Sequence, residues 1–157
     1  MAFTVIADGG ALQALNSQRL ALGDQRVNFL ALPGLVQQKL EKLYGETVTL
    51  EERIFCSVDF DKSESFHRKL QAEWDLELFP REETLTGTSQ EHRFTAYMAF
   101  ALGAQKHSEL VIISPEVTLM PFVKIANQSK CEVLQAWWGR PAGLNYSRGA
   151  DHFLDLE

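Results

Sequence analysis

The sequence lacks the features of membrane and disulfide-rich proteins. Apolar stretches such as residues 99–104 and 110–113 are far shorter than the roughly 20 residues needed to cross a bilayer. There are only two cysteines, Cys56 and Cys131, with no CxxC pair, which favours buried reduced thiols over a disulfide. No basic leader precedes Asp8, so we expect residues 3–7 to form a core strand rather than a signal peptide, and we expect a cytoplasmic protein.

Signature motifs of several enzyme classes are also missing. Neither GxGxxG nor GxxxxGK[ST] occurs, which gives nucleotide-cofactor binding no local support. HExxH, paired Cys/His ligands and GxSxG are absent, so zinc and serine hydrolase chemistry lack support as well. The net charge of -6 argues against a broad basic face for nucleic acid, although it leaves a local acidic metal site open. The four histidines have no shared spacing, and we expect structural roles for them.

What is present is an ordinary globular composition, 45% hydrophobic and 23% charged, with apolar strand patterns alternating with helical ones. We expect strands over residues 3–7, 53–60, 76–79, 110–114, 132–138 and 153–156. Helical patterns fall near residues 12–19, 35–44, 63–74, 89–103 and 117–127. Such alternation in 157 residues predicts one domain over residues 1–157. The expected architecture is α/β, a Rossmann-like three-layer fold with a mainly parallel central sheet flanked by helices.

Acidic residues follow several predicted strands, at the edge where open parallel sheets bind ligands. Asp8 follows the first strand, Glu116 follows the central one, and Glu91 begins the helix before it. If the first and central strands are neighbours, these carboxylates converge and suit Mg²⁺ or Mn²⁺. Each also has a structural interpretation: Asp8 as a helix cap, Glu91 and Glu116 as acids that complement a helix dipole. Asp59 and Asp61, after the second strand, are expected to be turn and cap residues.

Three segments resemble the NYN domain (LabA-like group) of the PIN-like nuclease superfamily: residues 5–9 (VIADG), 110–123 (LVIISPEVTLMPFV) and 149–156 (GADHFLDL). The resemblance implies a metal-dependent ribonuclease that cleaves RNA phosphodiesters with Mg²⁺ or Mn²⁺. It implies Asp8, Glu116 and Glu91 as metal ligands, and Thr118, at the position of a family aspartate, as a residue that orients water. Ala11 stands where the family has Asn, and His92 competes with Glu91 for the helix position.

Three functional hypotheses follow. The first is an endoribonuclease-like hydrolase with catalytic Asp8, Glu116, Thr118 and Glu91. The second is a catalytically degenerate NYN-fold binding or regulatory module, and the third an unrelated α/β regulator. RNA is the expected partner, no membrane association is expected, and a homo-oligomer is left open. A separate possibility is base stacking by Trp137 or Trp138 together with Arg140 and Tyr146.

Overall fold

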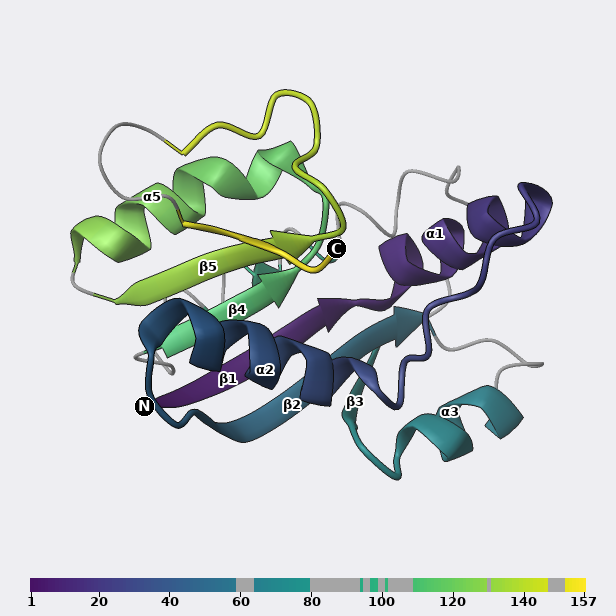
Figure 1. The fold of residues 1–157 in the computed structure, drawn as a ribbon. Helices are drawn as coiled ribbons and strands as arrows, with labels where there is room; N and C mark the ends of the chain where they lie inside the picture. The colour runs from purple at the N-terminus through teal and green to yellow at the C-terminus, as the bar shows by residue number, and fades with distance from the viewer. Residues whose placement is uncertain are drawn as a thin grey trace.

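The computed structural model describes residues 1–58, 64–79, 94, 97, 98, 101, 109–129, 131–146 and 152–157 (Figure 1). Its strands are β1 (Ala2–Asp8), β2 (Thr49–Val58), β3 (Asp75–Phe79), β4 (Glu109–Ile113), β5 (Glu132–Trp137) and β6 (Phe153–Asp155). Its helices are α1 (Gly9–Ala21), α2 (Leu32–Tyr44), α3 (Glu64–Leu70), the 3₁₀ turn η1 (Val117–Leu119) and α5 (Met120–Gln128). Predictions that concern Asp59, Asp61, Glu91 and His92 lie outside the described residues.

The strands form one sheet with the order β3-β2-β1-β4-β5-β6, and every neighbouring pair is parallel. This order reverses direction between β1 and β4, as in doubly wound nucleotide-binding folds. The α/β, Rossmann-like prediction is therefore confirmed. The first and central strands are neighbours, the condition on which convergence of the Asp8 and Glu116 strand ends depends, because Ala7 pairs with Ile113.

Two hydrophobic clusters cover the two faces of the sheet. On one face, Val5 and Ile113 pack with residues of α1, α2 and α3, such as Leu12, Val36 and Leu70. The opposite cluster joins other residues of the same strands to residues of η1 and α5. It also contains the helical residues Phe94 and Met98 and two residues before β6; its main members are Ile6, Cys56, Ile112, Leu119, Val123, Leu144 and Tyr146. Figure 1 shows α2 and α5 on opposite sides of the sheet. The architecture is thus helix, sheet, helix.

Several element boundaries follow local chemistry. Pro33 lies in the first turn of α2, where its missing N–H has no helical partner, and Gly45 ends that helix with a left-handed φ of 69°. The sequence prediction extended the third helix to Trp74, which was wrong. The chain leaves α3 at Leu70 through a tight turn, in which the Trp74 amide donates to the Leu70 carbonyl at 2.9 Å. Trp74 is nevertheless buried.

Neither cysteine forms a disulfide, as predicted; Cys56 is buried, also as predicted, whereas Cys131 is only half-buried. Among the described residues, no helix is both long enough and apolar enough to cross a membrane.

Candidate functional site

The candidate site lies at the carboxyl ends of β1 and β4, where the strand order reverses. Asp8 is the last residue of β1, and Ser114 directly follows β4. Since these strands pair in parallel, both side chains reach the same edge of the sheet. The Ser114 hydroxyl donates a hydrogen bond of 3.0 Å to Oδ2 of Asp8. The two strand ends are therefore joined by their side chains.

Asp8 also begins α1. Its backbone is extended, and its Oδ1 accepts a hydrogen bond of 3.1 Å from the amide of Ala11. This is the N-cap arrangement, in which a carboxylate satisfies a helix amide and complements the positive end of the helix dipole. The residue is only 4% exposed. The cap interpretation is thus confirmed, and the carboxylate is fixed in one orientation by partners on two elements.

Gly9 explains why the chain turns so sharply here. A Cβ at this position would lie 2.2 Å from the carbonyl oxygen of Cys56 and 2.5 Å from Cε1 of Phe55. Only glycine lets the first turn of α1 come this close to β2. The Asp-Gly sequence at the end of β1 therefore has a packing reason of its own.

A buried glutamine holds the turn that follows β4. Nε2 of Gln135, on β5, donates to the carbonyl oxygens of Ser114 and Glu116, at 2.9 Å each. Its Oε1 accepts from the hydroxyl of Tyr146. The Glu116 amide donates to Oγ of Ser114 at 3.2 Å. Gln135 is fully buried, so this network satisfies polar groups that water does not reach, and it fixes the backbone that carries Glu116.

Negative charge at Asp8 affects a neighbouring thiol. Cys56 pairs with Asp8 across the β1–β2 ladder and is buried. Burial first, and then the charges of Asp8 and Glu77, raise the pKa of the Cys56 thiol above its ordinary value of 9.0. The thiol is accordingly protonated at neutral pH and is not an activated nucleophile.

The structure describes Asp8 and Glu116 but not Glu91, the third predicted metal ligand. Asp8 is buried, Glu116 is half-buried, and Thr118 is exposed in η1, while Glu91 lies outside the described residues. In the part of the chain that the structure describes, no group of three or more His, Cys, Asp or Glu side chains is arranged to hold a metal ion. Asp8, Glu116 and Thr118 are all oxygen donors, and Mg²⁺ is commonly held by one or two carboxylates with water completing its shell. The donor chemistry fits such an ion.

Gln135 was missed by the sequence analysis. The available signal was a single polar residue inside the apolar stretch of β5, since a buried amide must find partners. Ser114 was noted only as part of a polar strand end, but it is the residue that connects Asp8 to the backbone of Glu116.

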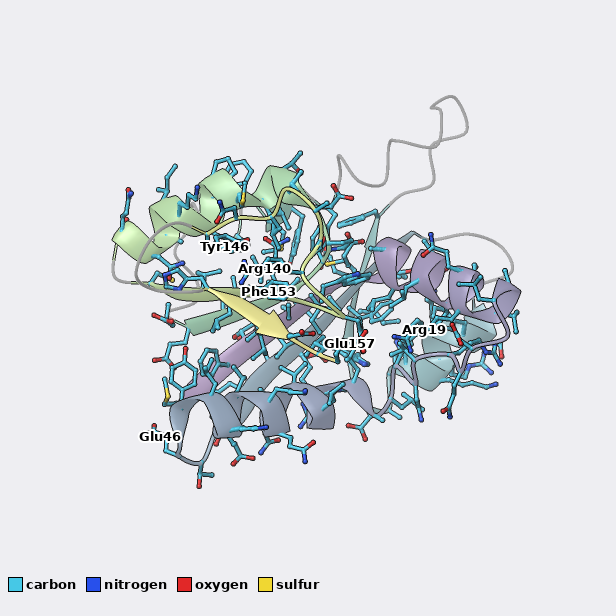
Figure 2. All side chains as sticks on the ribbon, turned by 45° about the horizontal axis from the view of Figure 1, so that its top comes forward. Arg19, Glu46, Arg140, Tyr146, Phe153 and Glu157 are labelled. Carbon is cyan, nitrogen blue, oxygen red and sulfur yellow. The ribbon has the colours of Figure 1, made fainter. Side chains whose placement is uncertain are left out.

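The residues considered for base stacking do not form one exposed platform. Trp137 and Tyr146 are buried, and the half-buried Trp138 has the guanidinium of Arg19 over its ring at 5.7 Å. Arg140 lies instead beside Phe153 (Figure 2), and its Cζ is 4.8 Å from the centroid of that ring. Their principal contacts are thus within the protein.

Comparison with solved structures found a protein of unknown function from Vibrio parahaemolyticus, whose crystal structure resembles this chain with a TM-score of 0.56. The two share 10% sequence identity, over 86% of this chain and 80% of that chain. No protein-family model matches the sequence, and no curated protein matches it either. At such low identity the likeness supports the α/β fold alone.

Proposed function

We propose that this chain is a metal-dependent, NYN-like RNA phosphodiesterase domain whose site lies at the carboxyl ends of β1 and β4. The observation that carries the proposal is the hydrogen-bonded connection from Asp8 through Ser114 to the amide of Glu116. It joins the carboxylate of Asp8 to the backbone of Glu116, the second acid that the family resemblance assigns to the site. Its position agrees with the general rule that open α/β sheets bind ligands where the strand order reverses.

Within this proposal, Asp8 and Glu116 hold a Mg²⁺ or Mn²⁺ ion, and Glu91 is the third predicted ligand. Such an ion, when bound, would supply positive charge to offset the negative charge of a phosphodiester attacked in line by water. Ser114 and Ala11 keep the Asp8 carboxylate in place, so it does not reorganise when substrate arrives. Gln135 restrains the backbone of Glu116 in the same way. The Thr118 hydroxyl, on the exposed first turn after β4, is the group that orients water.

A second candidate function is a non-catalytic RNA-binding or regulatory module with the same fold. It is favoured by one observation, that each oxygen of Asp8 already accepts a hydrogen bond from within the fold. Asp8 and Gly9 then serve the architecture of the β1–α1 turn, with no role in cleavage. The two functions differ in whether the Asp8 carboxylate is needed for turnover.

The test is cleavage of single-stranded RNA with added Mn²⁺, compared between the wild type and Asp8→Asn. Asparagine is also a good N-cap, so the variant keeps the cap on α1 and removes the charge. We expect wild-type cleavage that requires Mn²⁺, and a loss of about 100-fold or more in Asp8→Asn, the scale of losing a major electrostatic group at an active site. The melting temperature should change by only a few degrees.

Asp75→Asn is the matched control, because Asp75 is an exposed aspartate at the amino end of β3, on the opposite edge of the sheet. It should cleave as the wild type does. Cleavage that persists unchanged in Asp8→Asn would contradict the site assignment. RNA binding without any Mn²⁺-dependent turnover by the wild type would favour the module instead.

A further inference from the structure

A pocket of about 540 Å³ lies between the second half of α1, the segment that follows it, and α3. Its size falls within the range of small-molecule sites, about 300–1,000 Å³. Figure 1 shows that β1 and β2 both point toward α1 and α3. The pocket therefore lies at the carboxyl ends of the strands, as Asp8 does. Asn16, one of its lining residues, is eight positions after Asp8 in sequence, which is roughly 12 Å along a helix.

The wall formed by residues 25–30 is fixed although it has no regular secondary structure. Asn16 donates to the Val27 carbonyl at 3.0 Å and accepts from the Val27 amide at 2.7 Å. Asn28 accepts from the Leu30 amide at 3.0 Å, closing a short turn. The buried Trp74 indole donates to the Phe29 carbonyl at 2.8 Å. Because these hydrogen bonds from Asn16, Asn28 and Trp74 hold the wall in place, the pocket is largely formed before a ligand arrives, and less conformational entropy is lost on binding.

Aromatic rings form one part of the lining. Phe29 is buried and Phe66 is half-buried, and their ring centroids are 6.1 Å apart in an edge-to-face arrangement. Both also pack against Phe55, with centroid distances of 5.6 Å and 6.3 Å. Because Phe66 is held by this cluster but keeps exposed surface at the pocket, it offers a rigid face for a flat ring.

Two cationic side chains form another part of the pocket lining. Arg26 and Lys69 are exposed and line the pocket from the loop and from α3, respectively. Neither forms an ion pair with an acid among the described residues. In a chain of net charge -6, two unpaired cations beside an aromatic surface favour an anionic ligand locally. Amide side chains of Asn16, Gln25 and Asn28 line the remainder.

We propose that this pocket binds a nucleotide, with its base on Phe66 and its phosphate at Arg26 and Lys69. A flat aromatic group joined to a phosphate is the ligand chemistry that uses both the ring surface and the two cations. The nucleotide is either a free mononucleotide or one unit of a single-stranded RNA. This inference goes beyond the proposed cleavage, since none of the pocket residues belongs to the Asp8 site.

The test is direct binding, measured by titration calorimetry in EDTA so that metal-dependent cleavage does not take part. The probes are adenosine monophosphate, adenosine, inorganic phosphate and a short single-stranded oligoadenylate. The pocket variants are Phe66→Leu and the double variant Arg26→Gln/Lys69→Gln. The control is Lys42→Gln/Lys124→Gln, which removes the same charge from α2 and α5, outside the pocket. Since Phe66 belongs to a packed cluster, melting temperatures are measured for every variant, and the surface double variant tests the pocket without touching the core.

We expect the mononucleotide or the oligomer to bind the wild type, and each pocket variant to bind it about tenfold more weakly, the scale of one stacked base. The control variant Lys42→Gln/Lys124→Gln should bind as the wild type does. Adenosine and phosphate alone should bind more weakly than the mononucleotide. If the oligoadenylate binds more tightly than adenosine monophosphate, the natural ligand is single-stranded RNA. If their affinities are equal, the natural ligand is the free nucleotide. Absence of binding by both, or equal weakening in the control and pocket variants, would overturn the proposal.

Discussion

At the scale of single residues, Asp8 has structural work that is independent of any ligand. It caps α1 through Ala11, accepts from Ser114, and contributes negative charge beside Cys56. A carboxylate in this position connects β1, α1 and β4 at one point. These contacts are therefore sufficient by themselves to explain an acid at position 8.

The raised pKa of Cys56 predicts a pH dependence of stability. Because the folded protein holds the thiol proton more tightly than the unfolded chain, this contribution is fully present below about pH 9 and is lost as pH rises further. Cys56→Ala removes the titrating group. We expect its free energy of unfolding, from urea denaturation, to fall less steeply with pH above about pH 9 than that of the wild type, by up to about 1.4 kcal/mol per pH unit.

Val133→Ala is the control for the cavity that Cys56→Ala leaves, because Val133 is buried in the same cluster and does not titrate. It should lower stability while keeping the wild-type slope. Identical slopes for the wild type and Cys56→Ala would show that the thiol titrates equally in the folded and unfolded states.

Residues such as these also show how far the sequence could predict the site. Asp8 was identifiable because an acid at the end of an apolar strand, before Gly-Gly, is a local pattern. Its partner Ser114 is 106 positions away, and contact depended on β1 and β4 being neighbours, which the alternation of elements permits without requiring. A single polar residue in an apolar strand indicates that Gln135 has buried partners, but those partners, the turn after β4 and Tyr146, are brought to it only by the tertiary fold.

At the scale of elements, the tight packing of α1 against β2 determines where the candidate site is formed. The helix starts directly at the end of β1, and Gly9 allows its first turn to approach the Cys56 carbonyl.

The third predicted helix, over residues 63–74, ended earlier than its sequence pattern indicated. Its apolar spacing continued to Trp74, yet the helix stops at Leu70, because the Trp74 side chain is buried through a turn and a hydrogen bond to the Phe29 carbonyl. Periodicity alone does not distinguish these arrangements.

Gly9→Ala tests the α1–β2 packing. The new methyl group would overlap a backbone carbonyl, which has little freedom to move, so we expect a loss of about 3 kcal/mol or more in the free energy of unfolding. Gly34→Ala is the matched control, since nothing lies within 4 Å of a Cβ at that helical position. It should be neutral or stabilise by about 0.5–1 kcal/mol. Urea denaturation of both variants gives the comparison, and a Gly9→Ala protein as stable as the wild type would contradict the close approach.

At the scale of the whole molecule, the parallel sheet concentrates polar groups at one edge. Asp8, Ser114 and the Glu116 backbone meet at the reversal point between β1 and β4, and the pocket with Arg26 and Lys69 lies at the same end. Asn16, which lines the pocket, is roughly 12 Å along α1 from Asp8, so an RNA strand bound at the pocket would pass near the Asp8 site. The two proposals fit one surface, although each is tested separately.

The central claim, that Asp8 and Glu116 hold a divalent ion at the ends of β1 and β4, is tested most directly by a crystal soaked in Mn²⁺. Anomalous diffraction locates manganese without reference to activity. The account predicts an anomalous peak about 2.0–2.3 Å from an oxygen of Asp8 and from an oxygen of Glu116, and no peak there in Asp8→Asn crystals. No anomalous peak at Asp8 at a manganese concentration that supports RNA cleavage, or a peak that persists in Asp8→Asn, would contradict it.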